Sequence, residues 1–214
     1  MRHLDRLPEP QILIDRKIQW RDNFIASGKL RPDSSKYAHQ SVKSNLNSTS
    51  HHKCFYCETK LKGLTKEVDH HIEVSIDKTL SFEWENLYLS CDNCNGKINH
   101  RDIPVNECLN PTINSDDEIF EHLSFEKELI VPRNNSPLGL RTIQKYRLDS
   151  DLLDNRRLKQ ISLFQDVLLQ IKNSQIEENR DYLTDLEIEQ INSFKRVDSP
   201  FTLMFKVLLT KYGF

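Results

Sequence analysis

The chain has 214 residues, and its 30 Lys and Arg against 32 Asp and Glu give a formal net charge of −2. Leu, Ile, Val and Phe make up 62 of these residues, which excludes a disordered chain, and the 5 glycines argue against a turn-rich β-sandwich or a glycine-lined nucleotide site. The charge balance also excludes a protein that binds nucleic acid through a large overall positive charge.

The first ten residues lack the apolar region of a secretory signal, and no stretch approaches the ~18 consecutive apolar residues of a membrane span. We therefore expect a soluble, cytoplasmic protein with no membrane partner. In a reducing compartment, the five cysteines are expected to be metal ligands or buried thiols instead of disulfides.

Residues 1–50 carry 9 basic and 5 acidic side chains, which gives a local charge of +4. We expect this segment to form an N-terminal helical arm, and it is a candidate surface for partner docking. Pro10 precedes an apolar rhythm typical of one or two amphipathic helices, and Gly28 is a plausible helix end. The following segment, residues 41–53, is rich in Ser and Asn, and its composition predicts a loop.

Four of the five cysteines form two CxxC pairs that are separated by 33 residues: Cys54, Cys57, Cys91 and Cys94. Four thiolates are the ligands of a closed, tetrahedral zinc site, and such a site is structural because it leaves no position open for substrate. The spacer is longer than the roughly 15–20 residues of an ordinary zinc ribbon, so it must hold something else. Cys108 lies outside both pairs and is expected to be a small buried hydrophobe.

Residues 51–115 are predicted to form a zinc-framed core that contains two short strands and one short helix. Residues 66–70 can form the first strand, and Leu87, Leu89 and Cys91 alternate with polar residues in the pattern of a second strand. Asp92 is placed to begin a helix directly afterwards.

Residues 102–214 carry 14 basic and 19 acidic side chains, a local charge of −5, and residues 116–214 are expected to form a C-terminal helical region. Apolar residues recur there at helical spacing in one run, and Tyr182–Phe194 is a second helical stretch. The members of the first run are Leu158, Ile161, Phe164, Leu168 and Ile171. In the last predicted helix, Ser199 is expected to be the N-cap and Pro200 the first helical residue, with an apolar face extending to Tyr212. These faces predict core packing or a surface for a partner protein.

The motifs of the core together resemble a known family. The pattern C-x-x-C, Asp69-His70, W-x-N-L-x-L-S-C-x-x-C-N-x-K resembles the HNH nucleases of the ββα-metal type. More narrowly, residues 81–100, the LNP at 109–111 and the C-terminal SPFTLMFKVLL resemble the PtuB nuclease family of Septu antiphage systems, relatives of which are encoded with retrons. The predicted fold class is therefore α+β and mainly helical, built on a small zinc-stabilised ββα core.

The resemblance implies a role for each residue of the motif. His70 would be the general base, a role that suits a neutral histidine at cellular pH, with the adjacent His71 as the alternative base. Asp69 and Asn95 would hold a catalytic Mg²⁺ or Mn²⁺, because carboxylate and amide oxygens suit a hard cation. In a regular strand Asp69 and His70 project to opposite sides, so a distortion or a strand end is needed for both to serve one phosphate.

Three further residues have subordinate roles in this prediction. Asn86 would fix the loop that carries His70, while Lys97 and His71 are candidate phosphate contacts. The predicted function is metal-dependent cleavage of nucleic acid, and the alternative is a zinc-stabilised interaction module without nuclease activity. The resemblance further implies a PtuA-like ATPase as partner and, in a retron-associated system, a reverse transcriptase with its RNA–DNA product.

Overall fold

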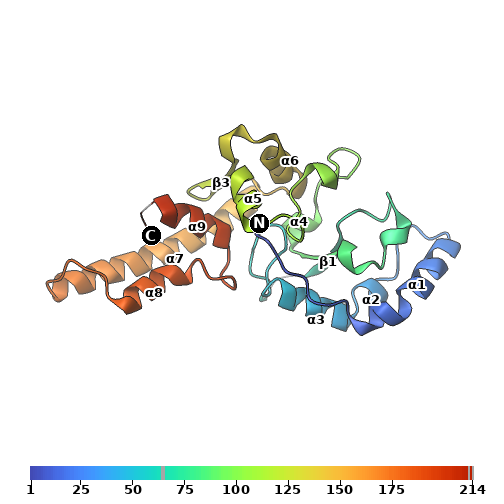
Figure 1. Cartoon of the computed structure of the whole chain (residues 1–214), viewed down its shortest axis with the longest axis horizontal. Coiled ribbons are helices and arrows are strands. Elements are labelled where there is room, and N and C mark those ends of the chain that lie inside the picture. The colour runs from blue at the N-terminus through green and yellow to red at the C-terminus, as the bar shows by residue number, and fades with distance from the viewer. Residues whose placement is uncertain (64–65, 212, 214) are drawn as a thin grey trace.

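The structure is a computed structural model that describes residues 1–63, 66–211 and 213. The molecule is elongated: helices of the first 50 residues lie at one end, the long helices of the C-terminal region lie at the other, and the small sheets lie between them (Figure 1). The helices at the N-terminal end are α1 (Gln11–Ala26), α2 (Ser34–Tyr37) and α3 (Gln40–Thr49).

Helix α1 begins and ends where the sequence predicts. Pro10 is its N-cap residue with φ of −60°, and Gly28, two residues past its end, has φ of +66°, a backbone conformation that glycine adopts without steric cost. Lys17 of this helix forms ion pairs with Glu9 and with Glu83 of the core, with N–O distances of 3.0 and 2.9 Å. The helix is therefore fastened to the core and does not project from it.

The prediction of a loop at residues 41–53 is wrong for most of that segment, because it forms helix α3. The side chain of His39 caps the helix by accepting a hydrogen bond from Ser41, and Val42, Leu46 and Thr49 form a buried face at helical spacing. This face packs against strand β2. Tertiary packing of that face outweighs the weak helix propensity of the Ser and Asn residues around it.

The core contains the predicted ββα unit. Strand β1 (Glu67–His70) pairs antiparallel with β2 (Leu87–Ser90), and helix α4 (Asp92–Asn95) follows immediately and contacts both strands. In the register, Val68 lies opposite Leu89 and Asp69 lies opposite Tyr88. Short 3-10 helices at Lys78–Leu80 and Trp84–Asn86 lie in the connection between the strands.

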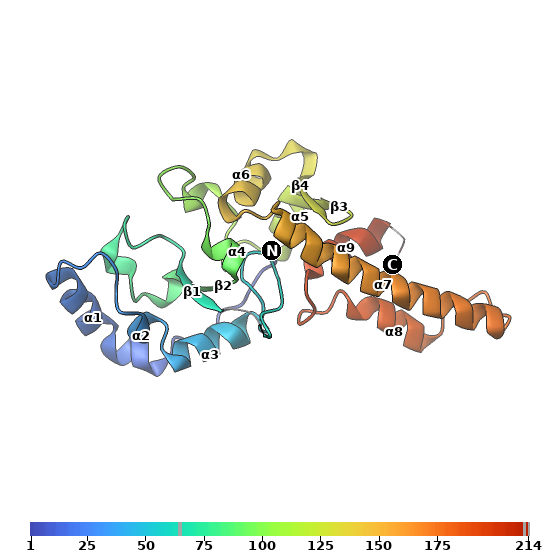
Figure 2. The ribbon, with the colours of Figure 1, turned by 180° about the vertical axis from the view of Figure 1, so that it is seen from behind.

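The connection from the core to the long helices contains a second hairpin that the sequence does not predict. Helix α5 (Asp116–His122) leads into strands β3 (Leu123–Glu126) and β4 (Leu129–Pro132), which pair antiparallel, and α6 (Pro137–Tyr146) packs against β4. Short 3-10 helices lie on either side of this unit, at Val105–Glu107 and Arg133–Asn135. Seen from behind, α6 and the hairpin lie on one side of the molecule, above α4 and the start of α7 (Figure 2).

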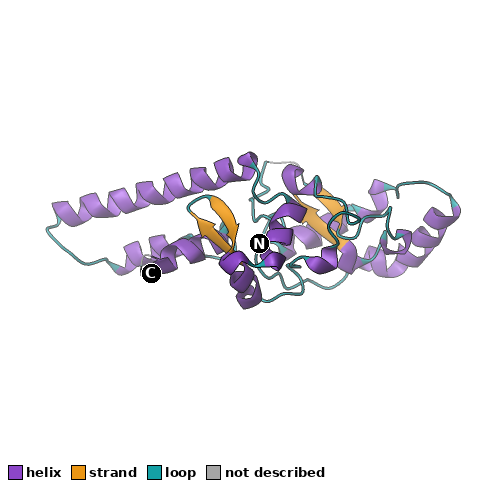
Figure 3. Ribbon diagram, turned by 90° about the horizontal axis from the view of Figure 1, so that it is seen from above, coloured by secondary structure: helices purple, strands orange, loops and turns teal. Residues whose placement is uncertain are grey.

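The C-terminal region consists of the long helix α7 (Asp151–Glu177), α8 (Asp185–Ser193) and α9 (Thr202–Lys211). Helices α7 and α8 run side by side, as the view from above shows (Figure 3). The predicted stripe on α7 is only partly buried: Phe164 and Ile171 are in the core, whereas Leu158 is 46% exposed. This mainly helical α+β architecture confirms the predicted fold class.

Helix α9 begins later than predicted. The structure starts it at Thr202 instead of Pro200, because Phe201 has φ of +53°, a left-handed conformation that interrupts the helix. Helix α9 contacts strand β3, and the ring of its buried Phe205 lies 5.6 Å from that of Phe164 and 4.9 Å from that of Phe194, centroid to centroid. Tyr212, the last residue of the predicted apolar face, lies outside the described residues.

One hydrophobic core runs through the protein from the arm to α9 and includes all five cysteines. The arm joins it through Arg6, whose guanidinium lies 4.6 Å from the ring centroid of Tyr88 and donates hydrogen bonds of 3.0 Å to the carbonyl oxygens of Trp84 and Leu87. Among the residues that the structure describes, no helix is both long and apolar enough to cross a membrane.

Candidate active site

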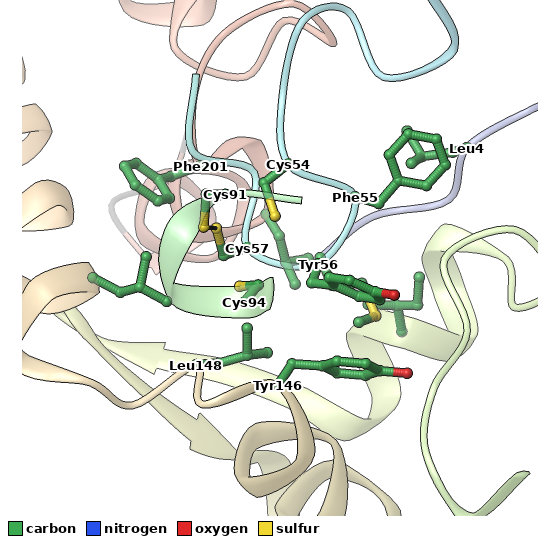
Figure 4. Packing of buried hydrophobic residues seen from close by; sticks show 14 of the residues in the cluster. Leu4, Cys54, Phe55, Tyr56, Cys57, Cys91, Cys94, Tyr146, Leu148 and Phe201 are labelled. Atoms are coloured by element: carbon green, nitrogen blue, oxygen red, sulfur yellow. Dashed lines mark hydrogen bonds between the residues drawn. The ribbon is translucent and has the colours of Figure 1, made fainter. Parts of the chain in front are cut away.

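The structure brings the four paired cysteines together in one cluster. Their sulfur atoms all lie within 4.8 Å of one another, and the Sγ atoms of Cys57 and Cys91 are 3.6 Å apart. A tetrahedral zinc with Zn–S bonds of about 2.3 Å requires sulfurs roughly 3.8 Å apart, so the cluster fits this ion. Cys91 lies at the N-cap of α4 and Cys94 within the helix, while Cys54 and Cys57 lie in the loop facing it (Figure 4).

The chemistry of the cluster also favours a bound cation. Burial raises the pKa of the Cys54 and Cys94 thiols well above the ordinary value, so four thiolates this close require a positive charge among them. The buried guanidinium of Arg157, which reaches in from α7, donates a hydrogen bond of 2.7 Å to the carbonyl of Leu148 and lies near the cysteine cluster. Arg156 of α7 links this region directly to the C-terminal helices, because it forms an ion pair of 3.2 Å with Asp92 of α4.

His70 lies in a cleft of about 480 Å³ that also reaches Asp69 and Asn95. Its Nε2 atom lies 2.9 Å from the carbonyl oxygen of Ser81. Because a carbonyl can only accept a hydrogen bond, Nε2 carries the proton and Nδ1 keeps a lone pair. Burial lowers the pKa of His70, against the opposing effect of the Ser81 carbonyl, so the ring is neutral at neutral pH.

Asp69 and His70 are the last two residues of β1, and both line the cleft although they alternate along the strand. The carboxylate of Asp69 accepts a hydrogen bond of 2.8 Å from the hydroxyl of Tyr56 and forms an ion pair with Lys97. Lys97 also donates a hydrogen bond of 2.7 Å to the carbonyl of His70. Lys97 therefore contacts Asp69 directly, and its side chain is buried with 3% exposure.

Asn86 lies below the cleft instead of lining it, and its side chain connects the two ends of one loop. Its Oδ1 accepts a hydrogen bond of 2.7 Å from the amide of Ile72, and its Nδ2 donates to the carbonyls of Ile72 and Leu80 at 3.0 and 3.2 Å. Ile72 follows His70 by two residues, and Leu80 precedes the residue that accepts the His70 hydrogen bond. Asn86 therefore holds both the histidine and its partner in place.

His71 occupies a different environment from its neighbour. Its ring stacks on that of Tyr88 with centroids 4.4 Å apart, its Nε2 lies 3.4 Å from Asn110 Nδ2, and it is 6% exposed. Burial lowers its pKa to about 3. His71 does not line the cleft, so its position offers no access to a phosphate there.

Residues of the arm complete the cleft, although the sequence does not identify them as part of the site. Arg31 and Tyr37 line it, and the ring of Tyr37 lies 4.6 Å from that of His70, centroid to centroid. Two further carboxylates, Glu67 and Glu73, line the same cleft, and Glu73 pairs with Lys145 at 3.2 Å. Arg31 is one of the nine basic residues that give residues 1–50 their charge of +4, but no signal in the sequence places Tyr37 beside His70.

The comparisons with known proteins agree with this geometry. Residues 54–101 match the family model of the HNH endonucleases, a range that begins at the first cysteine of the zinc cluster and contains β1, β2 and α4. The chain is also 32% identical over 117 residues to the Septu protein PtuB of Bacillus thuringiensis. That alignment covers 54% of this chain and 44% of the relative, so the chain spans about half the length of the protein it matches. Residues 54–101 are therefore similar to HNH endonuclease domains, and the chain is similar to PtuB over 117 residues.

Proposed function

We propose that this chain is a metal-dependent HNH endonuclease that hydrolyses phosphodiester bonds of nucleic acid. The observation that carries the proposal is the orientation of His70, which lines a cleft shared with Asp69 and whose Nε2 is held by the Ser81 carbonyl, while its Nδ1 forms no hydrogen bond among the described residues. A neutral histidine held in this way can take a proton from a water molecule that attacks a phosphate. The match of residues 54–101 to the HNH family supports the same chemistry.

The residues of the cleft fit a hard divalent cation. Asp69 and Asn95 supply carboxylate and amide oxygens, and together they would hold Mg²⁺ or Mn²⁺. When bound, such an ion neutralises the charge of the phosphate and stabilises the leaving oxygen. The ion pair with Lys97 and the hydrogen bond from Tyr56 hold the Asp69 carboxylate in place beside His70. The role of the four-cysteine cluster is structural, since all four positions of a zinc ion are filled by sulfur.

The proposed biological role is that of a toxic effector in antiphage defence together with a PtuA-like ATPase. The relative is named as a Septu protein, and the similarity extends over 117 residues, beyond the HNH domain alone. The near-neutral charge of the chain supports dependence on a partner, because binding to nucleic acid through counterion release needs several basic contacts. A retron reverse transcriptase and its RNA–DNA product stay a prediction from the resemblance.

A cleavage assay tests the nuclease proposal. The chain is purified with a co-expressed ATPase, supplied with Mg²⁺ or Mn²⁺ and nucleic acid, and compared with His70→Ala and with His52→Ala, a matched control because His52 is an exposed residue outside the cleft. We expect His70→Ala to reduce the cleavage rate roughly 10²- to 10⁴-fold, the usual contribution of a general base. The control should cleave at the wild-type rate.

The pH dependence of cleavage gives a second measurement on the same proteins. Burial lowers the pKa of His70 from its ordinary value of about 6.5, so the neutral, basic form predominates at and above pH 6.5 and is lost as the pH falls through the lowered pKa. The rate should therefore rise through an apparent pKa below 6.5 and reach a plateau. Equal cleavage by wild type and His70→Ala contradicts the proposal and favours the alternative of an interaction module.

A further inference from the structure

A second pocket adjoins the catalytic cleft on the side of the arm. It has a volume of about 280 Å³ and shares two lining residues, Arg31 and Pro32, with the cleft. Its floor is aromatic: the ring of Phe82 lies 5.8 Å from that of Trp20 and 6.4 Å from that of Phe24, centroid to centroid. The two pockets therefore adjoin at Arg31 and Pro32, and His70 lines one of them while the aromatic floor belongs to the other.

The rim of this pocket is positively charged. Three cations line it, Lys29, Arg31 and Lys36, against the single carboxylate of Asp33, which gives a local charge of +2. Within the described part of the chain, Lys29, Arg31 and Lys36 form no ion pair, so their charges remain available to a ligand. The Lys36 ammonium lies 6.0 Å from the ring centroid of Trp20, which places a cation beside the most accessible aromatic ring of the pocket.

The aromatic floor is connected to the catalytic residues through the chain itself. Ser81 accepts the hydrogen bond from His70, and the next residue, Phe82, forms the floor of the pocket. On the opposite side, Tyr37 packs against His70 six residues after Arg31. A ligand that spans both pockets would thus meet the general base and the aromatic floor in a fixed arrangement.

We propose that this second pocket is a strand-binding subsite that takes an unpaired nucleotide next to the scissile phosphate. Aromatic rings accept the face of a nucleobase, and cations beside them bind the adjoining phosphates. A base inside a duplex has both faces covered by its neighbours, so a pocket of this kind favours single-stranded or locally opened nucleic acid. The inference rests on the proposed function and specifies its substrate class.

The test measures binding of the full chain to fluorescently labelled oligonucleotides of mixed sequence. The probes are a single DNA strand, a single RNA strand and a DNA duplex, and binding is followed by anisotropy without added Mg²⁺ or Mn²⁺ in a His70→Ala background that prevents cleavage. We expect Trp20→Ala to weaken binding of a single strand about 5- to 150-fold, the loss usually seen when one stacking ring is removed. Binding to the duplex should change less than about twofold.

Three further variants separate stacking from general damage. Trp20→Phe keeps an aromatic face and should retain most of the affinity for a single strand. Arg31→Ala removes an exposed side chain without a carboxylate partner in the described residues, so the fold should be unaffected, and the salt dependence of strand binding should fall by about 0.7 of a unit in its logarithmic slope. Tyr182→Ala, which removes a 64% exposed ring near the far end of α7, is the matched control.

Several outcomes would overturn the subsite. These are a wild-type affinity in folded Trp20→Ala, an equal loss on strand and duplex, or no detectable binding of a single strand by the parent protein. The cleavage assay distinguishes this failure from failure of the nuclease proposal. Cleavage that depends on His70 but not on Trp20 removes only the subsite, whereas selective strand binding through Trp20 without cleavage removes only the nuclease.

Discussion

Asn86 offers a sharp test of how the active site is held together, because its side chain does not line the catalytic cleft. It makes three hydrogen bonds, from the Ile72 amide at 2.7 Å and to the carbonyls of Ile72 and Leu80 at 3.0 and 3.2 Å. These bonds close the loop between the two strands just beyond His70 on one side and just before Ser81 on the other. Their loss should disturb both the stability of the protein and the position of the base.

The size of the effect follows from these contacts. A hydrogen bond of this type contributes about 1 kcal/mol, and more when a buried partner is left unpaired, so Asn86→Ala should reduce the free energy of unfolding by at least about 3 kcal/mol. For a chain of this size, that loss corresponds to a decrease in melting temperature of about 6–12 °C. Asn86→Asp keeps the acceptor for Ile72 but loses both donors, so its loss should be about 2 kcal/mol or more.

Urea denaturation and thermal melting of the zinc-loaded protein measure this loss, and the cleavage assay measures its consequence for His70. Asn173→Ala, on the exposed surface of α7, is the matched control and should melt within about 1–2 °C of wild type. A wild-type melting curve for Asn86→Ala would refute the reasoning. If cleavage were lost in such a stable variant, Asn86 would have to act on the substrate directly.

Two other perturbations test the frame around the site. Cys91→Ser removes one of four clustered sulfurs, so it should abolish stoichiometric zinc binding. It should also lower the melting temperature sharply, because metal binding contributes about 10–16 kcal/mol in small zinc domains. Cys108→Ser, which lies outside the cluster, is the control and should still bind one zinc per chain by metal analysis. Gly139→Ala places a Cβ against the carbonyl oxygen of His122, so it should lower the free energy of unfolding in urea by about 1–3 kcal/mol. Leu140→Ala, at the exposed neighbouring position, should lower it by less than about 1 kcal/mol. Equal stability of these two variants would contradict the packing of α6 on α5.

The central unit could be predicted from the sequence because its signals are local and have a fixed spacing. Two CxxC pairs specify a metal cluster whatever surrounds them, and alternation of apolar residues specifies the strand that leads into Cys91. Both features are present in the structure, and α4 begins at Asp92 as the sequence predicts. Such features depend little on the rest of the chain, which is why sequence alone defines them.

Helix α3 and the β3–β4 hairpin could not be predicted, because in both cases distant residues decide the structure. The Ser- and Asn-rich composition of residues 41–53 predicts a loop, yet Val42 and Leu46 are fully buried against β2. In the hairpin, strands of four residues are too short to show alternation, and they are covered by α6 and α9. The local composition of these two segments does not indicate either contact.

The same reasoning explains which parts of the site escaped prediction. His70, Asp69 and Asn95 belong to one compact motif, but Tyr37 lies 33 positions before His70 and reaches it only through the packing of the arm. Nothing in the spacing of Tyr37 identifies it as a neighbour of the base, whereas the structure places the two rings 4.6 Å apart. Aromatic contacts between distant segments are therefore the information that the structure adds.

These contacts bear on how the three predicted segments cooperate. The segment boundaries at residues 50 and 115 stay predictions. Residues from both sides of the boundary at residue 50 form the cleft. Across the boundary at residue 115, Lys145 of α6 forms an ion pair with Glu73 at 3.2 Å. Arg156 of α7 likewise forms an ion pair with Asp92 of α4, at 3.2 Å. Because both flanks contribute to the catalytic or the metal region, a change in either flank, including the binding of a partner there, has a direct structural route to the histidine that we propose as the base.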